Sequence, residues 1–276
     1  MAKLTEREKA QALAREGKID EACASLAALH AKGDAAAGVS LAEVAAFRQQ
    51  WSDIVRFAEG ILRNPGEADT LNAYEEMVQV VALRGIHAGG WREIEALARG
   101  VIAQLRGKKL LDSQLHRVEH LLAFAKSEGK ATFVWDWGNH STLSDEERAA
   151  KFEAGVATVT KKKKFKSAEA RRDHLISLAD NVGFHKGAVA LYDQHGAPTL
   201  FNSVRFVAAG LARAGRPEEA WRILEPRLPD WWPVDGVQVA PLELLADDWL
   251  RPLITPERSE QVLRTPRGPE GAEKKS

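Results

Sequence analysis

The chain has 276 residues, enough to bury a substantial core as one elongated array or as two ordinary domains. Its 39 Lys plus Arg residues balance 39 Asp plus Glu residues, so no whole-molecule field attracts it to nucleic acid or to an anionic membrane. The single cysteine, Cys23, excludes an intramolecular disulfide framework and a cysteine-rich zinc site.

The N-terminal residues 1–9 lack the apolar stretch of a secretory signal. No run of about 18 uncharged apolar residues follows anywhere in the chain, as a membrane-spanning helix would require. We therefore expect a cytoplasmic protein that does not cross a membrane. A reducing compartment also fits the use of one cysteine.

Apolar residues recur at steps of three and four, which places them on one face of an α-helix. Residues 94–105 and 111–125 show this period clearly, and strand-like alternation is nearly absent. The sequence therefore predicts an all-α protein.

Two segments carry the pattern of a helix start, a hydroxyl residue followed three positions later by a carboxylate. They are Ser40 with Glu43 and Ser144 with Glu147. We expect a helix to begin at each of them.

An internal similarity links the two ends of the helical region. Residues 13–22 (LAREGKIDEA) align with residues 211–220 (LARAGRPEEA), each with a central glycine and a terminal alanine, Ala22 and Ala220. Glycine supplies the left-handed backbone that ends a helix, and alanine allows two helices to approach closely. Weaker copies place Ile54 32 residues after Ala22, Ile94 a further 40 residues on, and Ala188 32 residues before Ala220.

This glycine-turn pattern resembles the tetratricopeptide repeat, a helix-turn-helix unit of about 34 residues. The resemblance implies a right-handed α-α superhelix, a solenoid of helical hairpins with a broad concave surface. We expect the repeat domain to cover residues 1–232, with its register broken near 135–166. A Pro-rich extension of short helices would follow at 233–265, with a disordered tail at 266–276.

The change in composition marks this extension, because eight of the 11 prolines lie from Pro226 onward. Two short helices are expected there, at about 242–249 and 256–264. Thr255 and Pro256 form the start of the second, since proline suits the first turn of a helix.

One catalytic pattern occurs. His116, Glu119 and His120 match the H-x-x-E-H motif of inverzincin metallopeptidases, in which two histidines bind zinc and the glutamate acts as a base. A zinc-dependent hydrolase is therefore an alternative function. A repeat of helices does not resemble the mixed fold that houses this motif, so we expect two ordinary helix histidines, no metal and no cofactor.

A second alternative is nucleic-acid binding through the basic cluster at residues 161–172. The run KKKKFK at 161–166 could neutralise phosphates, and Phe165 could stack on a base. One aromatic residue in a lysine run is no recognition module, so we expect a solvated face or loop and no nucleic-acid partner.

Two pairs of tryptophans interrupt the hairpin pattern, and such residues often anchor interfaces. Trp135 and Trp137 lie near His140, and Trp231 adjoins Trp232. We predict that these five residues contact a protein partner, with burial in the core as the alternative. Trp51 and Trp91, at equivalent repeat positions, are expected to pack within the protein.

The sequence thus predicts a non-catalytic module that holds a peptide, toxin or enzyme domain in its concave surface. It would act as a scaffold or adaptor, or as an immunity-type inhibitor that covers a toxin or enzyme.

Overall fold

The computed structural model describes residues 4–62, 71–105, 112–135, 143–162, 164–233 and 237–267. Within these ranges the chain forms fourteen α-helices, two 3-10 helices and no strand. The prediction of an all-α protein is confirmed. Among the helices in these ranges, none is both long and apolar enough to cross a membrane.

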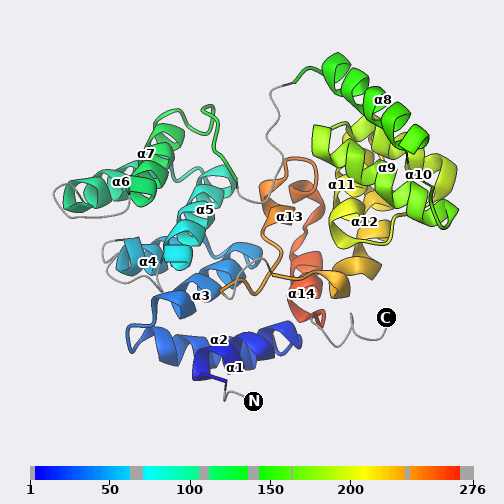
Figure 1. The fold of residues 1–276 in the computed structure, drawn as a ribbon. Coiled ribbons are helices and arrows are strands. Elements are labelled where there is room, and N and C mark those ends of the chain that lie inside the picture. Colours follow the sequence, from blue (N-terminus) through cyan, green and yellow to red (C-terminus); the bar gives the residue numbers. More distant parts are fainter. Residues whose placement is uncertain are drawn as a thin grey trace. The chain divides into compact units, whose positions relative to one another are not determined.

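The chain divides into two compact units (Figure 1). Unit 1 consists of Met1–Trp135, Trp232–Leu242 and Pro256–Pro266. Its helices are α1 (Glu6–Arg15), α2 (Ile19–His30), α3 (Ala35–Phe47), α4 (Trp51–Leu62), α5 (Leu71–Ala88), α6 (Trp91–Leu105), α7 (Asp112–Lys126) and α14 (Pro256–Arg264). Helices that follow one another pack together from α1 to α7, and α3 also packs against α5 and α14.

Unit 2 consists of Asp136–Trp231, Glu243–Thr255 and Arg267–Ser276. Its elements are α8 (Asp145–Lys162), α9 (Ala168–Val182), α10 (His185–His195), α11 (Phe201–Arg213), α12 (Pro217–Leu224), η2 (Glu225–Asp230), α13 (Glu243–Ala246) and η3 (Arg251–Leu253). Here, too, neighbours in the chain pack side by side, from α8 with α9 to α11 with α12. The expected extension at 233–265 is shared between the two units.

The predicted turn similarity is confirmed at the level of the hydrogen bonds. Gly17 and Gly215 adopt φ of 78° and 79°, the left-handed backbone that suits glycine. At the first turn the Lys18 amide donates to the Leu13 carbonyl at 2.9 Å, and at the second the Arg216 amide donates to the Leu211 carbonyl at 2.9 Å. Both turns therefore close their helices with the same bond between residues five apart, at the same aligned positions.

The alanines that follow these turns are buried. Ala22 in α2 and Ala220 in α12 are each 0% exposed. Alanine at such a position lets the helices of a hairpin approach closely, as the alignment predicted.

The prediction of a helix start at Ser40 is wrong. Helix α3 begins at Ala35, and Asp34 caps it by accepting a hydrogen bond from the Ala37 amide at 3.0 Å. Ser40 and Glu43 lie inside α3 and are both 0% exposed. The second start is correct. At the first turn of α8 the Ser144 amide donates to the Glu147 carboxylate at 2.8 Å, and the Glu147 amide donates to the Ser144 hydroxyl at 3.2 Å.

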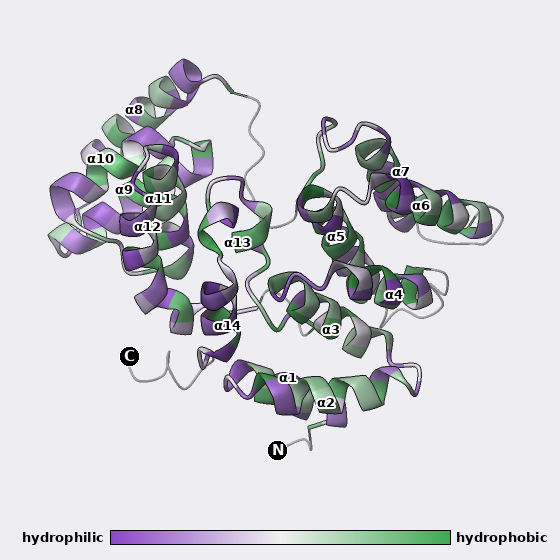
Figure 2. Ribbon diagram, turned by 180° about the vertical axis from the view of Figure 1, so that it is seen from behind, coloured by the Kyte–Doolittle hydropathy of each residue, from purple (hydrophilic) through white to green (hydrophobic). Residues whose placement is uncertain are grey.

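Helix α3 is the central element of unit 1. Every residue from Ala36 to Phe47 is buried, and Figure 2 shows α3 as largely hydrophobic. A helix that is apolar on all sides needs neighbours around its whole circumference. Helices α2, α4, α5 and α14 provide part of this cover. A non-helical segment from the C-terminal part of the chain provides more.

Candidate protein-binding site

Within unit 1, the N-terminal helices hold the non-helical segment Val237–Leu242. Two side chains of α3 form hydrogen bonds with main-chain atoms of this segment. The Ser40 hydroxyl donates to the Val237 carbonyl at 2.7 Å. The Glu43 carboxylate accepts two successive amides, from Val239 at 2.6 Å and from Ala240 at 3.1 Å. Main-chain bonds of this kind hold a segment without reading its side chains.

Polar side chains of two further helices complete this contact. The Gln11 amide of α1 donates to the Ser40 hydroxyl at 3.3 Å. The Gln238 amide of the segment donates to the Glu76 carboxylate of α5 at 3.4 Å. Gln11, Glu76 and Gln238 are buried. Buried polar groups are costly unless hydrogen-bonded, so these side chains specify where the segment lies.

Apolar side chains of the segment are removed from water. Val239 is fully buried, and Val237, Ala240 and Leu242 are buried almost as completely. Burial of a Val or Leu side chain contributes roughly 1.5–3 kcal/mol. The segment is therefore held by main-chain recognition together with apolar contact.

Helix α14, the last helix of unit 1, packs against α3. Its buried residues are Ser259, Val262 and Leu263, whereas most of the helix is hydrophilic in Figure 2. Its Arg264 lies against Gly17 in the turn between α1 and α2, where an added Cβ would overlap the Arg264 carbonyl oxygen. Glycine is thus required at position 17 for its backbone and for space.

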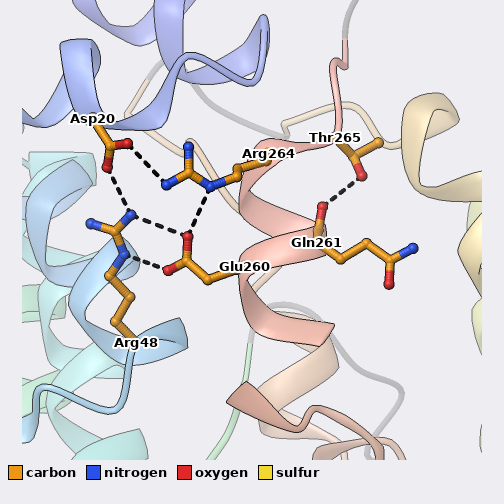
Figure 3. Close-up of polar contacts among 6 residues, drawn as sticks. All are labelled: Asp20, Arg48, Glu260, Gln261, Arg264 and Thr265. Carbon is orange, nitrogen blue, oxygen red and sulfur yellow. Dashed lines mark hydrogen bonds and ion pairs between the residues drawn. The ribbon is translucent and has the colours of Figure 1, made fainter. Parts of the chain in front are cut away.

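Four charged side chains link α14 to α2 and to the end of α3 (Figure 3). Arg48 donates to Glu260 at 2.7 Å and to Asp20 at 3.0 Å. Arg264 donates to Asp20 at 2.9 Å and to Glu260 at 3.1 Å. Each carboxylate therefore meets both guanidinium groups. We call Asp20, Arg48, Glu260 and Arg264 the α14 clasp.

The electrostatics of the α14 clasp follow from this geometry. A hydrogen bond from Arg264 lowers the pKa of Asp20, and one from Arg48 lowers the pKa of Glu260. The pairs are nevertheless open to solvent, since the side chains of Asp20 and Arg264 are 64% and 50% exposed. Exposed ion pairs are screened by salt and each contributes little to stability.

The sequence did not reveal this site. Ser40 and Glu43 carried a signal, but the spacing of a hydroxyl and a carboxylate by three residues is also the spacing of a helix cap. Only the burial of both side chains on a helix that begins earlier shows that they bind another segment.

The predicted contact residues around position 135 are described in part. Trp135 is half-buried, and its ring centroid lies 4.7 Å from that of Phe133. Phe133 in turn packs 5.2 Å from Phe124 of α7. Trp137 and His140 lie outside the described residues.

The second tryptophan pair places its members in opposite environments. Trp231 is 3% exposed, and its indole N–H donates to the Glu243 carboxylate at 2.8 Å. The Arg267 guanidinium lies 5.3 Å from its ring centroid. Trp232 is 52% exposed. Trp232 can thus present apolar surface to a partner, whereas Trp231 packs in the interior of unit 2.

Trp51 and Trp91 pack within unit 1, as predicted. The Trp51 ring stacks on His87 at 4.7 Å, and the Trp91 ring meets Phe124 edge-on at 5.3 Å.

The residues of the zinc motif lie together on α7. The ring centroids of His116 and His120 are 4.0 Å apart. Partial burial and the neighbouring His116 lower the pKa of His120. No group of three or more His, Cys, Asp or Glu side chains in the described ranges is arranged to hold a metal ion.

The basic cluster is split between solvent and interior. Lys161, Lys164 and Lys166 are exposed. Arg172 is buried, and it donates to Asp173 at 2.8 Å and to the His195 carbonyl at 3.3 Å. Arg172 is thus engaged within unit 2, whereas Arg171 beside it is exposed.

Neither a scan of protein-family models nor searches of curated proteins and solved structures find a match to the chain. Its function must be reasoned from its own residues.

Proposed function

We propose that this chain is a non-catalytic protein-binding module of divergent tetratricopeptide-like hairpins, a right-handed solenoid that works in the cytoplasm. The observation that carries the proposal is the way in which the segment Val237–Leu242 is bound by α3. There Ser40 and Glu43 use buried side chains to bind the main chain of a non-helical segment. Helical-repeat proteins bind protein segments with this kind of surface. The step from fold to function is an analogy.

Two features support a second contact region. Trp232 leaves half of a large apolar side chain in water, and Trp135 is partly accessible. Tryptophan is enriched among the residues that anchor interfaces, because it buries a large area at small entropic cost. The partner is a peptide or a domain of a toxin or enzyme, and the chain acts as an adaptor or as an immunity-type inhibitor.

Affinity capture of the full chain from its native cell, followed by mass spectrometry, tests this function. We expect a partner that is recovered near stoichiometrically and lost from the Trp232→Ala variant. Several partners would favour an adaptor, and one toxic enzyme that the chain inhibits would favour the immunity role. Recovery of no reproducible partner would count against the proposal.

A further inference from the structure

The segment Val237–Leu242 occupies unit 1 in a way that a different chain could reproduce. Its hydrogen bonds with Ser40 and Glu43 involve main-chain atoms, at Val237, Val239 and Ala240. Any segment that presents one carbonyl and two successive amides at this spacing offers the same bonds. The side-chain bond from Gln238 to Glu76 is long by comparison, at 3.4 Å.

The side chains of the segment are small or medium-sized and apolar. Val237, Val239, Ala240 and Leu242 are buried and carry no charge. The chemistry of an alternative occupant follows from this, because a charged side chain at these positions would be buried without a partner. The occupant must be a non-helical, uncharged, Val- and Ala-rich segment with two free successive amides.

The attachment beyond the segment is the weaker part of the assembly. Helix α14 buries only Ser259, Val262 and Leu263, and the α14 clasp is formed by partly exposed side chains. The helical core around α3 is apolar and continuous by comparison. Local opening begins where buried apolar contacts are few. Release of α14 therefore requires less free energy than unfolding of α3 and its neighbours.

We propose that unit 1 binds an uncharged, non-helical segment of a partner protein at the place held by Val237–Leu242, and that the α14 clasp retains the chain's own segment there. This inference rests on the proposed protein-binding function and names the chemistry of its partner. The chain's own segment competes with the partner, so breaking the clasp strengthens partner binding.

Hydrogen exchange on the full chain tests whether the α14 clasp retains the chain's own segment. The variant Arg48→Ala removes the three hydrogen bonds that Arg48 donates within the α14 clasp, two to Glu260 and one to Asp20. The matched control Arg56→Ala removes an exposed ion pair within α4, at 3.0 Å from Asp53, that does not touch α14. We expect the amides of Val237–Leu242 to exchange at least tenfold faster in Arg48→Ala than in Arg56→Ala, with α3 unchanged. If the amides of the segment exchanged only at the rate of the α3 amides, the segment would open only when the core unfolds. That result would overturn the proposal.

A labelled peptide tests whether a separate segment can bind in place of Val237–Leu242. The probe is a fluorescein-labelled hexapeptide, Val-Gln-Val-Ala-Pro-Leu, with the sequence of residues 237–242. Fluorescence anisotropy should show a Kd at least tenfold lower for Arg48→Ala than for Arg56→Ala. A peptide methylated on the nitrogen of its second valine loses the shorter of the two amide bonds to Glu43, the one that Val239 makes at 2.6 Å, so it should bind at least tenfold more weakly. Equal binding of both peptides, or binding of neither, would overturn the proposal.

The outcome separates this inference from the function on which it rests. A partner captured equally by wild type and Arg48→Ala, without peptide binding, would refute the inference and leave the protein-binding function standing. Peptide binding with no captured partner would support this site and count against the proposed cellular role.

Discussion

The left-handed backbone of Gly17 lies directly against the carbonyl oxygen of Arg264, 247 positions further along the chain. Its counterpart in the sequence, Gly215, has the same backbone conformation and no atom within 4 Å of the position of an added Cβ. The two glycines thus share one local role, and only Gly17 has a second one in docking α14.

Substitution of the two glycines separates these roles. Gly215→Ala should cost about 1–2 kcal/mol, the price of a left-handed backbone for a residue with a Cβ. Gly17→Ala should cost more, because its Cβ also displaces Arg264. Urea titration of both variants measures the free energy of unfolding. Equal losses would show that the contact with α14 adds nothing to stability.

The buried alanines provide a test of the hairpin packing. Ala22→Leu and Ala220→Leu should each lower the free energy of unfolding by about 1–3 kcal/mol, because the extra atoms overpack a helix crossing. Ala24→Leu is the matched control, since Ala24 lies in the same helix as Ala22 and is exposed. In thermal unfolding, the control should have a midpoint temperature close to that of wild type. If the two buried sites behaved like Ala24, the assigned crossings would be incorrect.

The sequence predicted much of the local structure. The alignment of residues 13–22 with 211–220 led to two turns with matching hydrogen bonds, because a helix end depends on a few neighbouring residues. The C-terminal helix at 256–264 was placed correctly from Thr255 and Pro256 for the same reason.

Long-range relations were beyond this reasoning. The bond from Val239 to Glu43 joins residues 196 positions apart, and no periodicity encodes it. Ser40 with Glu43 and Ser144 with Glu147 have the same spacing, yet the first pair binds a distant segment and the second caps a helix. Only tertiary structure distinguishes them.

The histidines of α7 offer a direct test of the zinc alternative. We expect the His116→Ala, His120→Ala double variant to match wild type in metal content and in thermal stability, as ordinary helix residues would. Metal analysis of protein purified without an affinity tag is the measurement. If wild type held near-stoichiometric zinc and the double variant lost it, a metal-dependent hydrolase would become the better hypothesis for the function.

The adjacent residues Trp231 and Trp232 should respond differently to truncation. Trp231→Ala opens a cavity and should lower the free energy of unfolding by about 3–5 kcal/mol. Trp232→Ala should leave stability nearly unchanged and weaken partner binding by about 2 kcal/mol or more. The same comparison applies to Trp135→Ala.

Unfolding and partner affinity should be measured on the same preparations of these variants. Loss of stability without loss of affinity at both Trp135 and Trp232 would assign the two exposed or partly exposed tryptophans to the structure of unit 1 and remove them from the binding surface.

The pH dependence of stability should have opposite signs at two glutamates. Burial raises the pKa of Glu243, and this outweighs the opposing charges of Arg205 and Arg267 and the hydrogen bond from Trp231. A carboxyl group with a raised pKa stays protonated up to a higher pH in the folded state than in the unfolded state. The folded state then binds more protons, so stability falls as pH rises above the ordinary glutamate value of about 4.3. The pKa of Glu260 is lowered, chiefly by the hydrogen bond from Arg48. The contribution of Glu260 to the stability of the fold is therefore lost as pH falls.

Substitution by glutamine makes both signs measurable. Glu243→Gln keeps an acceptor for the Trp231 indole and removes the buried charge, so its stability relative to wild type should increase from pH 4 to pH 8. Glu260→Gln should be less stable than wild type at pH 7, and this difference should shrink towards pH 3 as the wild-type carboxylate is protonated. Urea titrations across this range provide the comparison. A Glu243→Gln profile parallel to that of wild type would mean that Glu243 is ionised in the folded protein at no cost, contrary to its burial beside Trp231.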